Sequence, residues 1–76
     1  MAIQDEALMG MVSNAIAQDK RIGGQAIAVR VAHGEVSLKG IVDDNEQREL
    51  ASLVAHGVSG VRSVNIDELR VKEATE

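Results

Sequence analysis

The fold is decided by residues 26–40, which read AIAVRVAHGEVSLKG. Large apolar side chains alternate with small or polar ones on both sides of a His33-Gly34 step, and this period of two is typical of half-buried strands. Two such runs joined by a two-residue turn predict a β-hairpin, and Gly34 adopts the required positive φ at little cost. Gly40 interrupts the second strand on its inward parity, where we expect a helix to approach closely.

An amphipathic helix is predicted before the hairpin. Asp5 is its expected N-cap, Asp19 marks its expected end, and Gly23-Gly24 reads as a break in the chain. The side chains that share one stripe at helical spacing are Leu8, Met11, Val12, Ala15 and Ile16.

A second helix is predicted after the hairpin. It begins at the helix-start cluster of residues 43–45, with Glu46 and Gln47 just behind it, and ends at Gly57 or Gly60. Its expected apolar stripe contains Leu50, Ala51, Leu53, Val54 and Val58. The residues expected on its opposite, solvated side are Arg48, Ser52 and His56.

Residues 61–72 read as a third strand with a change of phase near Asp67-Glu68, which predicts a β-bulge or a restarted strand. The order helix–strand–strand–helix–strand predicts an α+β fold, a two-layer αββαβ sandwich with two helices on one face of a three-stranded mixed sheet. Which hairpin strand pairs with the third strand stays open. We expect one domain over residues 1–76, with an ordered core at about 5–72 and frayed termini.

Composition excludes several classes of function. The 76-residue chain has no Cys, which rules out disulfides, thiolate zinc sites and thiol nucleophiles, and no Phe, Tyr or Trp on which bases could stack. A net charge of −4, from 8 basic and 12 acidic residues, does not draw the whole domain to nucleic acid or to an anionic membrane leaflet, so either kind of binding would need a local basic patch. No run is long enough for a membrane span.

The ordered set of motifs resembles the BON domain, a small bacterial αββαβ module. The residues that carry the resemblance include the Gly34 turn, Gly40 in the run LKGIV at 38–42, and the Gly60-Val61 step before the last strand. The spacing of Val64 and Leu69 is one residue longer than the family pattern. The resemblance implies a non-enzymatic attachment module of periplasmic or envelope proteins, associated with osmotic stress and phospholipid. The motif residues themselves imply architecture rather than chemistry.

The start of the chain does not agree with that location. Met1 to Glu6 contains no basic or apolar signal region, so we expect either a cytoplasmic protein or a mature or excised form.

Neither catalysis nor a metal site is predicted. His33 and His56 are expected at a turn tip and on a solvated helix surface, with no nucleophile motif beside either. Residues 43–46 all carry side-chain oxygens, but they lack the alternate spacing of a calcium loop, and helix capping explains them. We expect no cofactor. Weak binding of a monovalent cation by loop carbonyls stays open.

The candidate binding surface is the side of the sheet away from the helices. Strand parity places Arg30 and Lys39 there, and the restarted parity of the last strand adds Arg70 and Lys72. These basic side chains predict recognition of an anion, such as phospholipid head groups or an acidic protein partner. The expected partners are thus a phospholipid membrane surface or an envelope protein. The alternative is ordinary strand surface, on which Lys and Arg protect edges from aggregation.

Three functions follow from these expectations. The first is a phospholipid- or envelope-binding module. The second is a protein-interaction or self-association module, because Ala28, Ala32 and Ile41 share the basic side and would suit a homodimer. The third is a sensor of a small ligand or cation.

Overall fold

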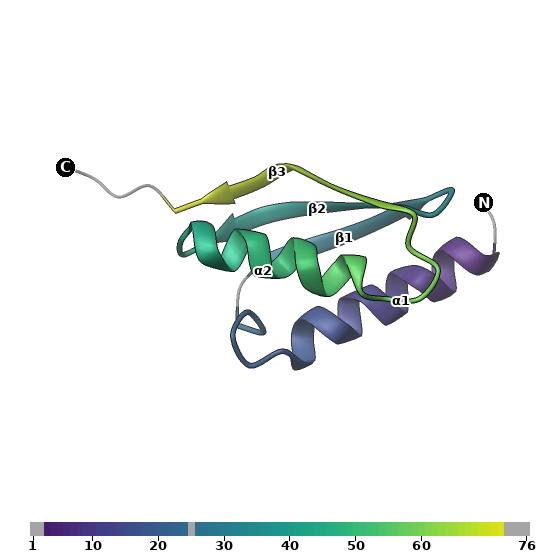
Figure 1. Ribbon diagram of the computed structural model, residues 1–76, viewed down its shortest axis with the longest axis horizontal. Coiled ribbons are helices and arrows are strands. Elements are labelled where there is room, and N and C mark those ends of the chain that lie inside the picture. The colour runs from purple at the N-terminus through teal and green to yellow at the C-terminus, as the bar shows by residue number, and fades with distance from the viewer. Residues whose placement is uncertain (1–2, 25, 73–76) are drawn as a thin grey trace.

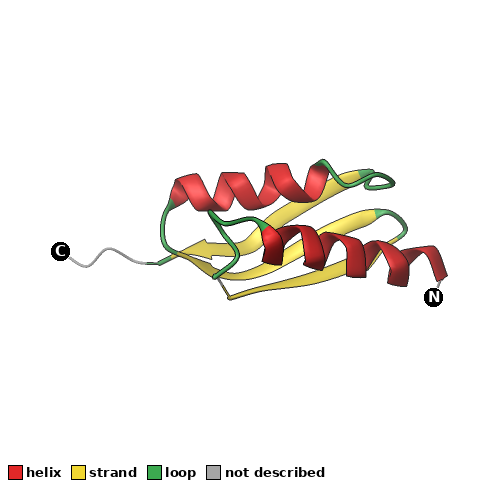
Figure 2. Ribbon diagram, turned by 90° about the horizontal axis from the view of Figure 1, so that it is seen from below, coloured by secondary structure: helices red, strands yellow, loops and turns green. Residues whose placement is uncertain are grey.

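The computed structural model describes residues 3–24 and 26–72, which form two helices and three strands. Their order is α1 (Ile3–Gln18), β1 (Ala26–Ala32), β2 (Glu35–Val42), α2 (Asn45–His56) and β3 (Ser63–Val71). Both helices lie on the same side of the sheet (Figures 1 and 2), with α1 over β1 and α2 over β2 and β3. The two-layer αββαβ sandwich is therefore confirmed. The tail expected to be frayed lies, at 73–76, outside the described residues.

The strand order is β1-β2-β3, so the hairpin strand β2 is central. β1 and β2 pair antiparallel, whereas β2 and β3 pair parallel through the α2 crossover. The question left open by the sequence is thus answered, because β3 joins β2. β1 and β3 are the two edge strands.

The hairpin turn has positive φ at both central residues, 55° at His33 and 82° at Gly34. This pair of angles is typical of the type I′ turn that matches the twist of a two-residue hairpin. The carboxylate of Asp5 accepts hydrogen bonds from the backbone N–H of His33 at 3.0 Å and of Gly34 at 3.3 Å. The expected N-cap role of Asp5 is wrong, because α1 already begins at Ile3. Asp5 instead lies on the buried side of α1 and holds the hairpin turn.

The predicted bulge is confirmed in β3. Ser37 of β2 is paired with Asn65, and Lys39 is paired with Glu68, so two residues of β3 are opposite Leu38. The side-chain oxygen of Asn65 accepts a hydrogen bond from the N–H of Asp67 at 2.8 Å. This local turn stabilises the extra residue and restarts the strand on the other parity.

The core lies between the helices and the inward side of the sheet. Its fully buried members include Val12, Val36, Leu38, Val42 and Leu69. Both helix stripes were predicted too broadly, because Met11 is 47% exposed and Leu53 is 70% exposed.

α2 packs through its alanines rather than its leucines. Ala51 and Ala55 are fully buried, and their small side chains allow the helix backbone to lie close to the sheet. Leu53 is about 200° around the helix axis from Ala51, so it points to solvent. Ile22, in the loop after α1, is also fully buried, although no periodic pattern marks it.

Gly40 is required by its neighbouring strand and not by a helix. Its φ is 145°, and a Cβ built there would clash with the backbone carbonyl oxygen of Ala26 on β1. The expectation of a close helix is therefore wrong, although the glycine does mark a place where two backbones approach closely.

Arg48 does not extend into solvent from α2 as expected. Its guanidinium donates hydrogen bonds to the carbonyl oxygens of Leu69 and Ile66, at 2.5 Å and 3.1 Å. Both carbonyls belong to the edge strand β3. An unpaired strand edge can pair with another chain, and a charged side chain that occupies its acceptors hinders such pairing.

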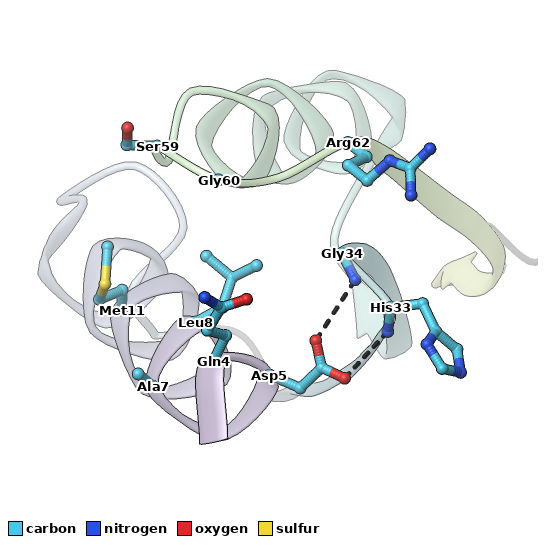
Figure 3. A pocket seen from close by; sticks show the side chains of 10 residues that line it. All are labelled: Gln4, Asp5, Ala7, Leu8, Met11, His33, Gly34, Ser59, Gly60 and Arg62. Atoms are coloured by element: carbon cyan, nitrogen blue, oxygen red, sulfur yellow. Dashed lines mark hydrogen bonds between the residues drawn. The ribbon is translucent and has the colours of Figure 1, made fainter. Parts of the chain in front are cut away.

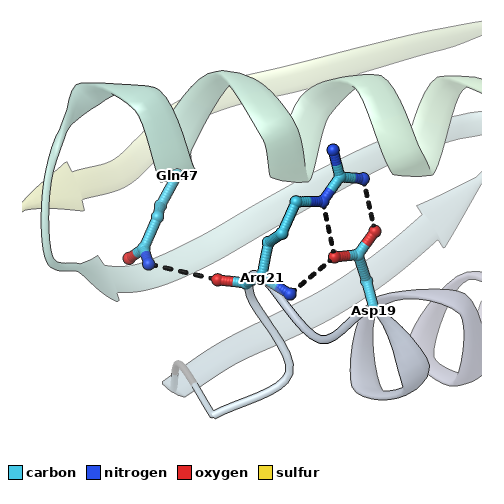
Figure 4. A network of polar contacts seen from close by, with 3 residues as sticks. All are labelled: Asp19, Arg21 and Gln47. Atoms are coloured by element: carbon cyan, nitrogen blue, oxygen red, sulfur yellow. Dashed lines mark hydrogen bonds and ion pairs between the residues drawn. The ribbon is translucent and has the colours of Figure 1, made fainter.

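The loop after α1 is hydrogen-bonded to the first turn of α2 (Figure 4). Asp19 forms a 2.7 Å ion pair with Arg21, and Gln47 donates a 3.1 Å hydrogen bond to the carbonyl of Arg21. The side-chain hydrogen bond from Arg21 lowers the pKa of Asp19 from 3.8 to about 2. Gln47 also donates its backbone N–H to the carboxylate of Asp44 at 2.9 Å, and Asp44 is the N-cap of α2. One glutamine therefore contacts both the loop after α1 and the first turn of α2.

Candidate functional site

The side of the sheet without helices is called here the bare face. It is defined by strand residues whose parity is opposite to the buried Val36, Leu38 and Val42. These residues are Ala26, Ala28, Arg30 and Ala32 of β1, Glu35, Ser37, Lys39 and Ile41 of β2, and Ser63, Asn65, Glu68 and Arg70 of β3.

All four predicted basic residues are exposed, and they come from different parts of this surface. Arg30 lies on edge strand β1, Lys39 on central β2 and Arg70 on edge strand β3. Lys72 follows the end of β3, where its N–H donates to the carbonyl of Val42 at 2.6 Å. The register brings Lys39 beside Ala28 and Arg70 beside Ile41. The four cations are thus spread over the bare face and the end of β3.

Acidic residues share this surface, which the sequence reasoning missed. Glu68 is paired with Lys39 across β2 and β3, and Glu35 lies at the hairpin end of β2. The position of Glu68 follows only from the register after the bulge, although the predicted restart near Asp67-Glu68 was a signal for it.

A polar depression lies in the bare face at the bulge. Its volume is about 280 Å³. The row Arg30–Ser37–Asn65, one residue from each strand, crosses it. Its lining residues are Arg30, Ser37, Leu38, Asn65, Asp67 and Glu68. The bulge thus creates a hollow with a cation on the β1 side and carboxylates on the β3 side.

A larger cavity of about 620 Å³ lies at the hairpin end of the sandwich (Figure 3). It is lined by α1, the hairpin turn and the loop between α2 and β3. Leu8 points into it, and Asp5 turns its carboxylate to the hairpin turn. Because both Asp5 oxygens accept turn N–H groups, this carboxylate serves the fold and forms no acid–base pair with the exposed His33.

The structural residues implied by the family pattern lie beside this cavity or within the sheet. A Cβ added to Gly34 would meet the Arg62 side chain at 2.7 Å, so the glycine lets that side chain cross the turn. Gly60 has a φ of 101°, and the partly buried Val61 packs on the core directly after it. Gly34, Gly60 and Val61 therefore shape the hairpin end, as Gly40 shapes the opposite end of the sheet.

A third cavity, of about 560 Å³, lies between α2 and the open edge of β3. Its lining includes the exposed Leu53 and His56 of α2 and the half-buried Ile66 of β3. Within residues 3–24 and 26–72, three or more metal-ligating side chains do not gather at any point. No helix in this same part of the chain combines the length and apolarity needed to cross a membrane.

Comparison with known proteins agrees with this architecture. The family model described as the BON domain matches residues 4–73. The osmotically-inducible protein Y of Escherichia coli (strain K12) is 36% identical over 74 residues, covering 97% of this chain and 36% of that protein.

A solved structure shares the fold at low identity. The C-terminal domain of CdsD, the structural protein of the type III secretion system of Chlamydia trachomatis, matches 91% of this chain and 34% of that chain, with a TM-score of 0.72 and 15% identity. This chain spans about a third of the length of either relative. Because the family model covers nearly the whole chain, the protein belongs to the BON domain family.

Proposed function

We propose that this chain is a non-enzymatic binding module whose bare face associates with anionic phospholipid at the bacterial envelope. One observation carries the proposal: Arg30, Lys39 and Arg70 are exposed on the sheet surface that no described helix covers, and Lys72 follows at its end. Lys and Arg close to an anionic membrane surface contribute about 1 kcal/mol each. Glu35 and Glu68 oppose this attraction, so the expected binding is moderate and sensitive to salt.

The family and the relative support the same proposal. The relative is named for its induction by osmotic stress, a condition that acts on the cell envelope. A sheet surface that contains both cations and the 56% exposed Ile41 suits an interface between water and lipid head groups.

Vesicle co-sedimentation tests the proposal. Wild-type protein is mixed with phosphatidylglycerol vesicles or phosphatidylcholine vesicles at low ionic strength. We expect binding to the first only, and we expect Arg30→Glu/Lys39→Glu to weaken it at least about 30-fold, since the loss of two basic residues removes about 2 kcal/mol.

The matched control is Lys20→Glu/Arg62→Glu, which changes the net charge equally at two exposed residues outside the bare face. We expect this control to bind nearly as well as the wild type. Equal weakening by both double variants would show that net charge alone governs binding. Absence of wild-type binding to phosphatidylglycerol would refute the proposal.

Self-association is the second candidate function. Ile41 is 56% exposed on the bare face, and Ala26, Ala28 and Ala32 of β1 give that face a row of small side chains. Such a surface could be covered by a second copy. Sedimentation velocity over a range of protein concentrations without lipid tests this candidate: the wild type should form a dimer as the concentration rises, and Ile41→Lys should remain a monomer.

A further inference from the structure

The depression at the β3 bulge carries charges of both signs on opposite sides. Arg30 lines it on the β1 side, and Asp67 and Glu68 line it on the β3 side. Ser37 lies between them on β2, in the same row as Arg30. Since neighbouring strands are about 4.8 Å apart, the two outer strands are separated by about 10 Å. A small ligand could therefore contact both sides at once.

These charged groups are not used to hold the fold. The hydrogen bonds and ion pairs of the described residues leave the side chains of Arg30, Asp67 and Glu68 without a partner. In Asp67 it is the backbone N–H that is engaged, since it donates a hydrogen bond to the side-chain oxygen of Asn65. By contrast, Arg48 and Asp5, which have structural roles, each make two hydrogen bonds. The depression thus presents a cation and two carboxylates that are available to a ligand.

The arrangement selects among charged head groups. A guanidinium favours a phosphate, and a nearby hydroxyl such as that of Ser37 can donate to the same group. A purely anionic ligand would be repelled by the Asp67 and Glu68 carboxylates, because its phosphate has the same sign of charge. A primary ammonium joined to the phosphate by a short linker would instead donate hydrogen bonds to these carboxylates. A quaternary ammonium has no N–H to donate, and it is bulkier.

We propose that this depression recognises a phosphate ester that bears a primary ammonium group, the chemistry of a phosphoethanolamine head group. Its volume of about 280 Å³ and its polar lining suit a head group rather than an acyl chain. The inference rests on the proposed function in that both place lipid head groups on the bare face. It adds a specific pocket and a preference within that face.

Soluble head groups test the inference without vesicles. Glycerophosphoethanolamine, glycerophosphoglycerol and glycerophosphocholine are each titrated into ¹⁵N-labelled protein, and backbone amide shifts are followed by NMR. We expect saturable shifts at Arg30, Ser37 and residues 65–68 with glycerophosphoethanolamine. The other two compounds should bind about tenfold more weakly, because each lacks the charge-assisted hydrogen bonds of the ammonium.

Two variants assign the roles of the charges. Arg30→Gln should weaken the binding of all three compounds. Asp67→Asn/Glu68→Gln should remove only the preference for glycerophosphoethanolamine over the other two. The latter variant should also bind phosphatidylglycerol vesicles more tightly than the wild type, since two repelling charges are gone. Glu49→Gln, an exposed carboxylate on α2, is the control and should change neither result.

The outcomes separate this inference from the proposed function. Equal binding of the three compounds, or no saturable shift at any soluble concentration, overturns the inference even where phosphatidylglycerol vesicles still bind. Saturable, ammonium-dependent binding by a protein that ignores anionic vesicles would support the pocket and refute the broader association with anionic membranes.

Discussion

Asp5→Ala offers the sharpest test of how the two layers are joined. The Asp5 side chain is only 8% exposed and accepts N–H groups from both residues of the hairpin turn, at 3.0 Å and 3.3 Å. A hydrogen bond to a charged group contributes about 1.5–3 kcal/mol, but the longer bond lies at the weak end, and water can partly replace both at a turn. The expected loss is about 2 kcal/mol of unfolding free energy.

That loss is large for a domain of this size, because the free energy of unfolding of a protein is commonly only about 0.05–0.15 kcal/mol per residue. Urea unfolding followed by far-UV circular dichroism measures it, because the chain has no Trp or Tyr for fluorescence. Glu6→Ala removes an exposed carboxylate from the same helical turn and should change the unfolding free energy by less than about 0.5 kcal/mol. If the two variants were equally stable, the role assigned to Asp5 would be wrong.

Three further substitutions test other features. Gly40→Ala should cost more than about 2 kcal/mol of unfolding free energy, because it combines a positive φ with a clash against Ala26; little change in urea unfolding would contradict this. Arg48→Ala should free the β3 edge and cause concentration-dependent association in sedimentation velocity, whereas a monomer at all concentrations would show that the edge needs no protection. The Asp19–Arg21 contact, which lowers the pKa of Asp19 from 3.8 to about 2, should stabilise the fold above pH 3.8 and be lost as the pH falls through 2. The difference in Tm between wild type and Asp19→Asn should therefore vanish toward pH 2, and a difference that persists there would have another cause.

Local periodicity in the sequence was sufficient to predict the helices and strands and their order along the chain. The His33-Gly34 step, the end of α1 before Asp19 and the start of α2 at the 43–45 cluster each depend on a few adjacent residues, and all three are confirmed. The bulge before Glu68 was also visible, because the apolar parity changes within one strand.

Features that depend on how the layers meet were not readable from the sequence. Leu53 fits an apolar stripe by spacing, but α2 turns its alanines to the sheet. Asp5 was assigned as a cap, whereas it lies on the buried side of α1 with Leu8 and Val12, where its partner is the hairpin turn of the other layer. The two-point contact of Arg48 with β3 required the position of the third strand.

For the same reason, only part of the candidate surface could be predicted from the sequence. Strand parity indicated Arg30 and Lys39, but the neighbours of each depend on the register across strands. Glu68 beside Lys39, and the depression in which Arg30 is opposite two carboxylates, follow from a bulge whose depth and direction no local pattern specifies.

The most direct test of the central claim locates the surface that contacts lipid. Methyl groups are observed by NMR with bicelles that contain phosphatidylglycerol and a spin-labelled lipid. Ala28 and Ile41 report on the bare face, and the exposed Ala17 and Leu53 report on the helix layer. The proposed orientation predicts strong broadening of the Ala28 and Ile41 methyl signals and little change at Ala17 and Leu53. Broadening that begins on the helix layer, or none on either side, would contradict it.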